Sequence, residues 1–319
     1  MTAKTRNRLL AMVIALATAL GLVAVTSGEA AARIGGTQVG LQQFWVNGCG
    51  MPKVKVRAWK RPGNYKTVIM LDGMRAQYDY SGWEINTNIQ EMVRSGINVV
   101  EPIGGPASFY TDWVAPSNFN HQRYRYRWNC VITRTLIRGL DRRGFRVGRG
   151  KHKKYAIMGL SMGGNAALSI AAQNRRTFDR AGSLSGYNFL SAPGMRTMIR
   201  LAMLDVDPKP WNVDSMWPFF GPQWFQNDPM WNIGNMHGMK VFVGSGNGLF
   251  GKYNALPNVF DDLFKGSTLE FLAYVQAKAF EANAAIQGLP VMTYDAVGTH
   301  AWGYWQDMVW NAKARGFFR

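Results

Sequence analysis

Cysteine, acidic residues and internal repeats are scarce in this chain of 319 residues. Its 2 Cys exclude a disulfide-dense small protein and a zinc site with four cysteine ligands. Only 19 acidic residues stand against 37 Lys and Arg, which gives a net charge of +18. No Gly-X-Y period, heptad pattern or repeat is present, so collagen, coiled-coil and solenoid architectures are excluded. Hydrophobic residues nevertheless make up 47% and charged residues 18%, which is the composition of a folded globular protein.

The first 32 residues are typical of a secretory signal peptide. Three basic residues come first, an apolar run follows over residues 9–25, and small residues follow at 27–32. The alternative is an uncleaved membrane anchor, although the run is slightly short for a span of about 20 residues. We expect export with cleavage after Ala32, one large domain over residues 33–319, and no membrane-spanning helix in the mature chain.

Export changes how the positive charge and the cysteines are interpreted. Between residues 123 and 154 many Arg and Lys residues surround a single acid, Asp141. For an exported protein, an anionic lipid or envelope polymer is a better partner for this basic run than nucleic acid, and the alternative is a solvated face that binds nothing specific. Cys49 and Cys130 are the only possible disulfide pair. A bridge would stabilise the fold by about 4 kcal/mol in the chain-entropy model; the alternative is two buried thiols.

Short apolar runs alternate with helical patterns along the rest of the chain. Strands are predicted at residues 54–59, 67–71, 97–100, 155–159, 181–185, 240–243 and 290–294, and helices at 166–172 and 258–287. This alternation predicts an α/β fold with a mostly parallel central sheet and helices on both faces. Residues 187–238 are rich in Trp and Pro and are predicted to form an irregular insertion.

Residues 159–163 match the pattern G-x-S-x-G, between a predicted buried strand and a predicted helix. That context is the nucleophile elbow of an α/β-hydrolase, because the glycines allow a turn sharp enough to expose the Ser161 hydroxyl. The chain order of this fold then calls for an acid and, near the C-terminus, a histidine. His300 follows the last predicted strand and fits that order. His121 precedes the nucleophile, and His152 and His237 are better explained as surface or packing residues.

The acid and the oxyanion hole are less directly marked. The loop after the strand at 240–243 contains no carboxylate. Spacing alone leaves five candidates for the acid, namely Asp261, Asp262, Glu270, Glu281 and Asp295. One backbone N–H of the oxyanion hole should come from Met162, the residue after the nucleophile. The turn at residues 71–75 is the natural source of the second, with the Met74 N–H as the candidate.

Together with this elbow, several blocks resemble the mycobacterial antigen 85 mycolyltransferases and their corynebacterial relatives. They occur in the order found in that family, at residues 71–77, 79–87, 104–105, 108–113, 159–164, 181–185, 227–229, 246–248 and 298–302. The resemblance implies an exported α/β-hydrolase that moves a mycolyl chain from trehalose mycolates to envelope acceptors, with no metal or organic cofactor. Departures lie after Trp128 and after Ser185, and they concern the acceptor and the lipid-entry surface.

The resemblance also implies roles for individual residues. It assigns Ser161 as nucleophile and His300 as base, and it selects Glu270 as the acid. Met74 and Met162 match the oxyanion-hole positions. The residues that match the family's trehalose pocket are Asp72, Arg75, Asn86 and Trp302. Their polar groups and the Trp face suit a sugar.

Two other kinds of function remain as alternatives. A secreted carboxylesterase or thioesterase of the same fold would share the triad but would lack the sugar-lining residues. A cell-surface binding protein with a vestigial site would keep the fold without the reaction. The sequence leaves open which hydroxyl accepts the acyl group: a trehalose mycolate, arabinogalactan or a protein.

Overall fold

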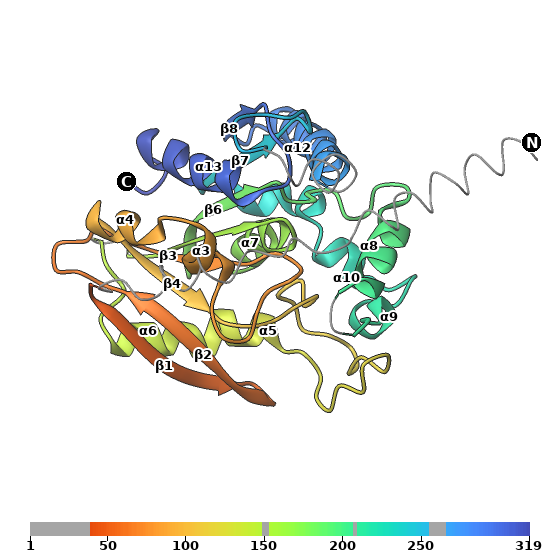
Figure 1. Ribbon diagram of the computed structural model, residues 1–319, viewed down its shortest axis with the longest axis horizontal. Coiled ribbons are helices and arrows are strands. Elements are labelled where there is room, and N and C mark those ends of the chain that lie inside the picture. Colours follow the sequence, from red (N-terminus) through yellow and green to blue (C-terminus); the bar gives the residue numbers. More distant parts are fainter. Residues whose placement is uncertain (1–38, 149–152, 207–208, 255–265) are drawn as a thin grey trace, which may run out of the picture.

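The computed structural model describes residues 39–148, 153–206, 209–254 and 266–319. Within these residues the chain forms one eight-stranded sheet in the order β1-β2-β4-β3-β5-β6-β7-β8 (Figure 1). The strands are β1 Leu41–Gly48, β2 Met51–Trp59, β3 Lys66–Leu71, β4 Ile97–Pro102, β5 Tyr155–Leu160, β6 Phe178–Leu184, β7 Lys240–Gly246 and β8 Val291–Ala296. The expected signal peptide lies outside the described residues.

The sheet is parallel from β4 to β8, and the mostly parallel α/β architecture predicted from the sequence is confirmed. β3, β4 and β5 are buried at every position, which explains their continuous apolar runs. The edge strand β1 was not predicted. It pairs antiparallel with β2, and it alternates buried Phe44 and Val46 with exposed Gln43 and Trp45. β1 was missed because its polar, exposed positions leave no continuous apolar run of the kind that marks the central strands.

Helices cover both faces of the sheet. The helical segments are α3 Gly82–Asn86, α4 Ile89–Arg94, α5 Trp128–Cys130, η1 Val131–Leu136, α6 Ile137–Arg142, α7 Met162–Gln173, α8 Met195–Leu204, α9 Val213–Met216, α10 Gln223–Gln226, η3 Pro229–Met236, α12 Thr268–Ile286 and α13 Trp302–Ala314. Along β3, Ile69 and Leu71 belong to the core shared with α6, α7 and α12, whereas Val68 and Met70 belong to the core shared with α4 and α13. This alternation is the two-residue period of a strand buried on both sides.

The insertion at residues 187–238 is more helical than predicted. It contains α8, α9, α10 and η3, and α8, α9 and α10 lie together at one side of the molecule, away from β1 and β2 (Figure 1). In α8 the buried residues Met195, Ile199 and Met203 recur every fourth residue. That spacing marks one helix face. The expectation of an irregular insertion missed these short helices because the surrounding Trp and Pro residues obscured their period.

Other boundaries shift by less. α7 begins at Met162, directly after the elbow, rather than at 166. The described part of the helix predicted at 258–287 is α12, and the stretch 255–265 lies outside the described residues.

Cys49 and Cys130 are joined by a disulfide with Cα atoms 6.2 Å apart, which ties the turn between β1 and β2 to α5. None of the helices in the described ranges has the length and hydropathy needed to cross a bilayer.

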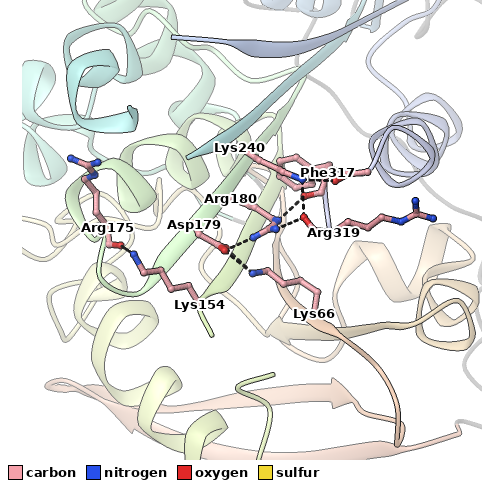
Figure 2. A network of polar contacts seen from close by, with 9 residues as sticks. Lys66, Lys154, Arg175, Asp179, Arg180, Lys240, Phe317 and Arg319 are labelled. Carbon is pink, nitrogen blue, oxygen red and sulfur yellow. Dashed lines mark hydrogen bonds and ion pairs between the residues drawn. The ribbon is translucent and has the colours of Figure 1, made fainter. Parts of the chain in front are cut away.

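The amino ends of β3, β6 and β7 are tied to the C-terminal tail (Figure 2). Lys66 Nζ lies 2.7 Å from Asp179 Oδ1, and Asp179 also contacts the Arg180 guanidinium. Arg180 Nε donates to the Phe317 carbonyl at 2.7 Å, and Lys240 Nζ donates to the Arg319 carbonyl at 2.7 Å. This network therefore fixes the last residues of the chain against the amino edge of the sheet.

Candidate active site

Ser161 occupies a strained turn between β5 and α7. Its φ is +51° and its ψ is −123°, a backbone conformation that residues other than glycine rarely adopt. The flanking glycines are required by space. A Cβ on Gly159 would lie 2.3 Å from the Gly163 carbonyl oxygen, and one on Gly163 would lie 2.4 Å from the Asp72 carbonyl oxygen. The Ser161 N–H is held by the Leu184 carbonyl at 2.8 Å. The local geometry is thus that of a nucleophile elbow.

The turn after β3 packs directly against this elbow. A Cβ on Gly73 would lie 3.6 Å from Ser161 Cβ, so the turn that contains Met74 adjoins the hydroxyl-bearing residue. The Met74 carbonyl accepts from the Ala107 N–H at 2.9 Å, which fixes the orientation of the following peptide. Met162 is buried at the start of α7, where the first N–H groups of a helix have no partner within it. The Met162 N–H directly follows Ser161, and the turn that contains Met74 adjoins it, so both N–H groups remain candidates for the oxyanion hole.

His300 and Glu270 are in direct contact. His300 Nδ1 lies 2.6 Å from Glu270 Oε2, and the Glu270 side chain is completely buried in the first turn of α12. Ser185 Oγ donates to Glu270 Oε1 at 2.6 Å, and the Gly246 N–H donates to the same oxygen. The Ser185 hydroxyl, the Gly246 N–H and the His300 ring therefore fix the position of this carboxyl group.

The histidine ring is held on two sides. Tyr187 stacks on it at 6.5 Å between ring centroids, and Trp305 meets it edge-on at 4.9 Å. The Trp305 indole N–H also donates to Ser185 Oγ at 2.9 Å, which completes a chain from Trp305 through Ser185 to Glu270. Burial raises the pKa of the Tyr187 hydroxyl well above its usual range. The sequence did not reveal these contacts of Tyr187, Trp305 and Ser185 with His300 and Glu270, although Ser185 lies in one of the blocks that resemble the antigen 85 family.

The other candidates for acid and base lie elsewhere or outside the described residues. Asp295 and Glu281 both contact Lys278, at 2.7 Å each, and Asp295 is exposed. His121 and His237 are exposed. Asp261, Asp262 and His152 fall outside the described residues. The contact with His300 therefore favours Glu270 among the acids that the structure describes.

Three of the four expected sugar-lining residues converge on Gly82. A Cβ on Gly82 would lie 2.3 Å from the Trp302 ring, and the Gly82 N–H donates to Asp72 Oδ1 at 3.1 Å. Asn86 Nδ2 donates to the Gly82 carbonyl at 3.0 Å. The fourth residue, Arg75, is exposed and forms an ion pair of 3.0 Å with Asp205.

Asp72 is a buried carboxyl beside the elbow. Ser81 Oγ donates to it at 3.0 Å, and its own N–H donates to the Tyr110 hydroxyl at 3.0 Å. Burial raises the pKa of Asp72 to about 7, against the opposing effect of the Ser81 and Gly82 hydrogen bonds. The carboxyl can therefore act as a donor or an acceptor near neutral pH. Within the described ranges, no group of three or more His, Cys, Asp or Glu residues could hold a metal ion.

Comparisons with known proteins agree with this geometry. The family model described as "Putative esterase" matches residues 50–315. The chain is 34% identical to the diacylglycerol acyltransferase/mycolyltransferase Ag85C of Mycobacterium leprae, over 97% of this chain and 91% of the relative. It is 33% identical to Ag85A of Mycobacterium tuberculosis (strain ATCC 25618 / H37Rv), over 79% and 73% respectively.

Solved structures share the fold. The crystal structure of Mycobacterium tuberculosis MPT51 (FbpC1) matches with a TM-score of 0.69 at 22% identity, covering 88% of this chain and 99% of that one. The substrate-bound serine hydrolase FphF of Staphylococcus aureus matches with a TM-score of 0.61 at 13% identity, covering 87% and 98%. The elbow, the buried His–Glu pair and the extent of these matches lead to one assignment: the chain belongs to the esterase family of α/β-hydrolases and, within it, to the antigen 85 mycolyltransferases.

Proposed function

We propose that this chain is an acyltransferase that moves a mycolyl group from trehalose monomycolate, through an ester on Ser161, to a second hydroxyl. The observation that carries the proposal is the 2.6 Å contact between His300 and the fully buried Glu270, in a fold that also contains the Ser161 elbow. The acceptor is another trehalose monomycolate, arabinogalactan or a further envelope hydroxyl.

The first half-reaction forms the acyl-enzyme. His300 Nδ1 faces Glu270, so Nε2 is the ring nitrogen left to take the proton from Ser161 Oγ. The oxygen attacks the ester carbonyl, and the N–H groups of Met74 and Met162 stabilise the oxyanion. The C–O bond to trehalose then breaks, and the sugar oxygen receives the proton from His300. Trehalose leaves, and the mycolyl chain remains on Ser161.

The second half-reaction uses the same groups in reverse. His300 removes the proton from the acceptor hydroxyl, whose oxygen attacks the Ser161 ester, and the proton returns to Ser161 Oγ. Transfer must compete with hydrolysis, so the acceptor has to be held near the ester. The group around Gly82 supports sugar binding, because Asp72 and Asn86 offer polar atoms and Trp302 offers a ring face.

Product analysis tests this proposal. The protein is incubated with trehalose monomycolate, and the lipids are separated. Trehalose dimycolate is the expected product, and Ser161→Ala should abolish it. Free mycolic acid without dimycolate would instead identify the secreted esterase alternative. A protein that forms neither product, and that a fluorophosphonate probe does not label at Ser161, would be a binding protein with a vestigial site.

We also propose that the chain is exported and that its basic run attracts an anionic envelope surface. Export rests on the sequence pattern of residues 1–32, and the mass of the mature protein tests it. Within residues 123–148, Arg127 contacts Asp112, Arg146 contacts Asp141, and Arg143 packs over Phe44. Several of these side chains are thus engaged locally, which favours long-range attraction over a built binding site. Retention on DNA that survives physiological salt would contradict the expectation of no nucleic-acid partner.

A further inference from the structure

Four aromatic side chains are exposed on the part of the insertion that follows α9, in the loop before α10, in α10 and in η3. Phe220 is 90% exposed and Trp231 65%, while Phe219 and Phe225 are 39% and 40% exposed. Phe219 and Phe220 pack at 4.9 Å between ring centroids, and Phe225 and Trp231 pack at 5.2 Å. Single exposed apolar residues are ordinary, but a contiguous group marks a surface that contacts something else. We call these four residues the aromatic patch.

Two arginines of α8 lie within the aromatic patch. The Arg196 guanidinium is 5.8 Å from the Phe219 ring and 5.2 Å from the Phe225 ring, so it joins the two aromatic pairs. Arg200 lies 5.2 Å from the Phe219 ring, and its charge is paired with Asp214 at 2.5 Å, so Arg196 carries the charge of this surface. Arginine stacked on exposed rings combines an apolar face with positive charge, the combination found in segments that lie in the boundary between acyl chains and headgroups.

Buried residues and hydrogen bonds support the aromatic patch, and the same segment of the chain contacts the proposed catalytic histidine. Trp224 is fully buried beneath it and meets Trp217 at 5.0 Å. Trp231 Nε1 donates to Ser191 Oγ at 2.9 Å, and Ser191 Oγ donates to the buried Asp228 at 2.7 Å. The insertion begins at Tyr187, whose ring stacks on His300. The exposed rings are therefore presented by the same segment that packs on the proposed catalytic histidine.

We propose that the aromatic patch seats the enzyme on an anionic lipid surface, with the Phe and Trp rings among acyl chains and Arg196 on a lipid phosphate. The inference extends the proposed function, because a donor with a long acyl chain resides in a lipid phase. Charge favours a lipid surface over a second copy as the occupant. A twofold contact would bring the Arg196 guanidinium of each copy toward the other, and like charges repel. An anionic lipid surface complements both the rings and Arg196.

Flotation with phospholipid vesicles tests the proposal without any acyl substrate. The mature protein is mixed with vesicles of phosphatidylcholine containing phosphatidylglycerol, and with vesicles of phosphatidylcholine alone. The wild type should float with the anionic vesicles and less with the neutral ones. Moving one Phe side chain into an apolar phase changes an equilibrium constant by about tenfold. Phe219→Ser/Phe220→Ser should therefore weaken binding by roughly a hundredfold, and Phe220→Ser alone by about tenfold.

Matched variants control for the loss of an exposed apolar side chain. Ile286→Ser and Trp45→Ser remove residues that are 84% and 57% exposed, at the end of α12 and on β1. Both should bind vesicles like the wild type. Arg196→Gln should lose the preference for anionic vesicles while retaining weaker binding through the rings.

The inference would be wrong if the wild type floated with neither kind of vesicle, or if Phe219→Ser/Phe220→Ser floated like the wild type. It would also be wrong if the protein formed a dimer without lipid and this double variant were a monomer. Cleavage of a soluble short-chain ester separates this failure from failure of the proposed function. The patch variants should retain it, because their side chains lie outside the proposed triad. A protein without esterase or transferase activity that still floats through the patch would refute only the proposed function.

Discussion

The two edges of the parallel sheet carry different chemistry. At the carboxyl edge, Ser161 and Ser185 have φ values of +51° and +49°, and the buried carboxyls of Asp72 and Glu270 accept from hydroxyl, amide and imidazole groups. At the amino edge, Lys66, Asp179 and Arg180 form a continuous ion-pair network that fixes the C-terminal tail (Figure 2). The carboxyl edge thus combines strained backbone with buried acids, and the amino edge carries the ion-pair network of Lys66, Asp179 and Arg180.

The difference separates groups that serve chemistry from groups that serve stability. A strained residue of this kind costs about 1–3 kcal/mol and persists only where the surrounding fold imposes it. In open α/β sheets ligands bind at the carboxyl ends of the strands, so such strain is expected at that edge. Substitutions at the carboxyl edge should therefore remove activity while sparing or improving stability, and those at the amino edge should do the reverse.

Replacement of the proposed nucleophile should have the largest effect. Ser161→Ala removes the oxygen that is proposed to bond to the acyl group, so kcat for acyl transfer should fall by about 10⁴- to 10⁶-fold. Ser161→Gly should be equally inactive and should also relieve the positive φ, which raises the free energy of unfolding by about 1 kcal/mol. Transfer assays and urea unfolding of both variants measure the two effects. A Gly variant that unfolds more easily than the Ala variant would mean that the elbow stores no strain.

Glu270→Gln should rank second. The amide preserves the shape of the side chain but cannot stabilise a charged imidazole, and kcat should fall by about 10³- to 10⁴-fold. Circular dichroism and the melting temperature should stay close to those of the wild type. Near-normal transfer by this variant would remove Glu270 from the proposed triad. Asp295→Asn, on the exposed side of Lys278, is the matched control and should keep full activity.

The amino edge should respond in the opposite sense. Asp179→Asn leaves the buried cations of Lys66 and Arg180 without their anionic partner, so the free energy of unfolding should fall by about 3 kcal/mol. Transfer activity per folded molecule should not change. Glu91→Gln breaks an exposed ion pair with Arg94 and should cost less than about 1 kcal/mol. If Asp179→Asn and Glu91→Gln lowered the free energy of unfolding equally, the buried amino-edge network would stabilise the fold no more than an exposed ion pair does.

The sequence predicted the carboxyl edge better than the amino edge for a physical reason. Ser161 lies in a local pattern that glycines and a strand–helix junction enforce, and the strands from β3 to β8 are marked by their own apolar runs. Glu270 required the family resemblance, because it reaches His300 from a helix and not from a strand end. The contacts of Ser185 with Glu270 and Trp305 join residues 85 and 120 positions apart, and no local pattern encodes such a distance. The aromatic patch was missed because a Trp-rich sequence looks the same whether its rings are buried or exposed.

Asp72 offers the most specific test of the comparison, because its effect depends on pH. Burial raises its pKa from about 4 in an unfolded chain to about 7 in the fold. The folded state thus binds this proton more tightly than the unfolded state. The contribution of Asp72 to the free energy of unfolding is fully present below about pH 4 and is lost as the pH rises toward 7. A neutral side chain here should abolish that dependence.

Asp72→Asn keeps an oxygen for the Ser81 and Gly82 hydrogen bonds but carries no charge. Its free energy of unfolding relative to the wild type should therefore increase between about pH 4 and pH 7 and then level off. Glu101 is also buried, and burial raises its pKa well above the usual range, but it is present in both proteins and largely cancels from the difference. Ser161→Ala serves as the control, with a difference that stays constant with pH. If the free energy of unfolding changed with pH in the same way for Asp72→Asn and the wild type, the buried Asp72 carboxyl would ionise without destabilising the fold. The contrast between the two edges would then depend on backbone strain alone.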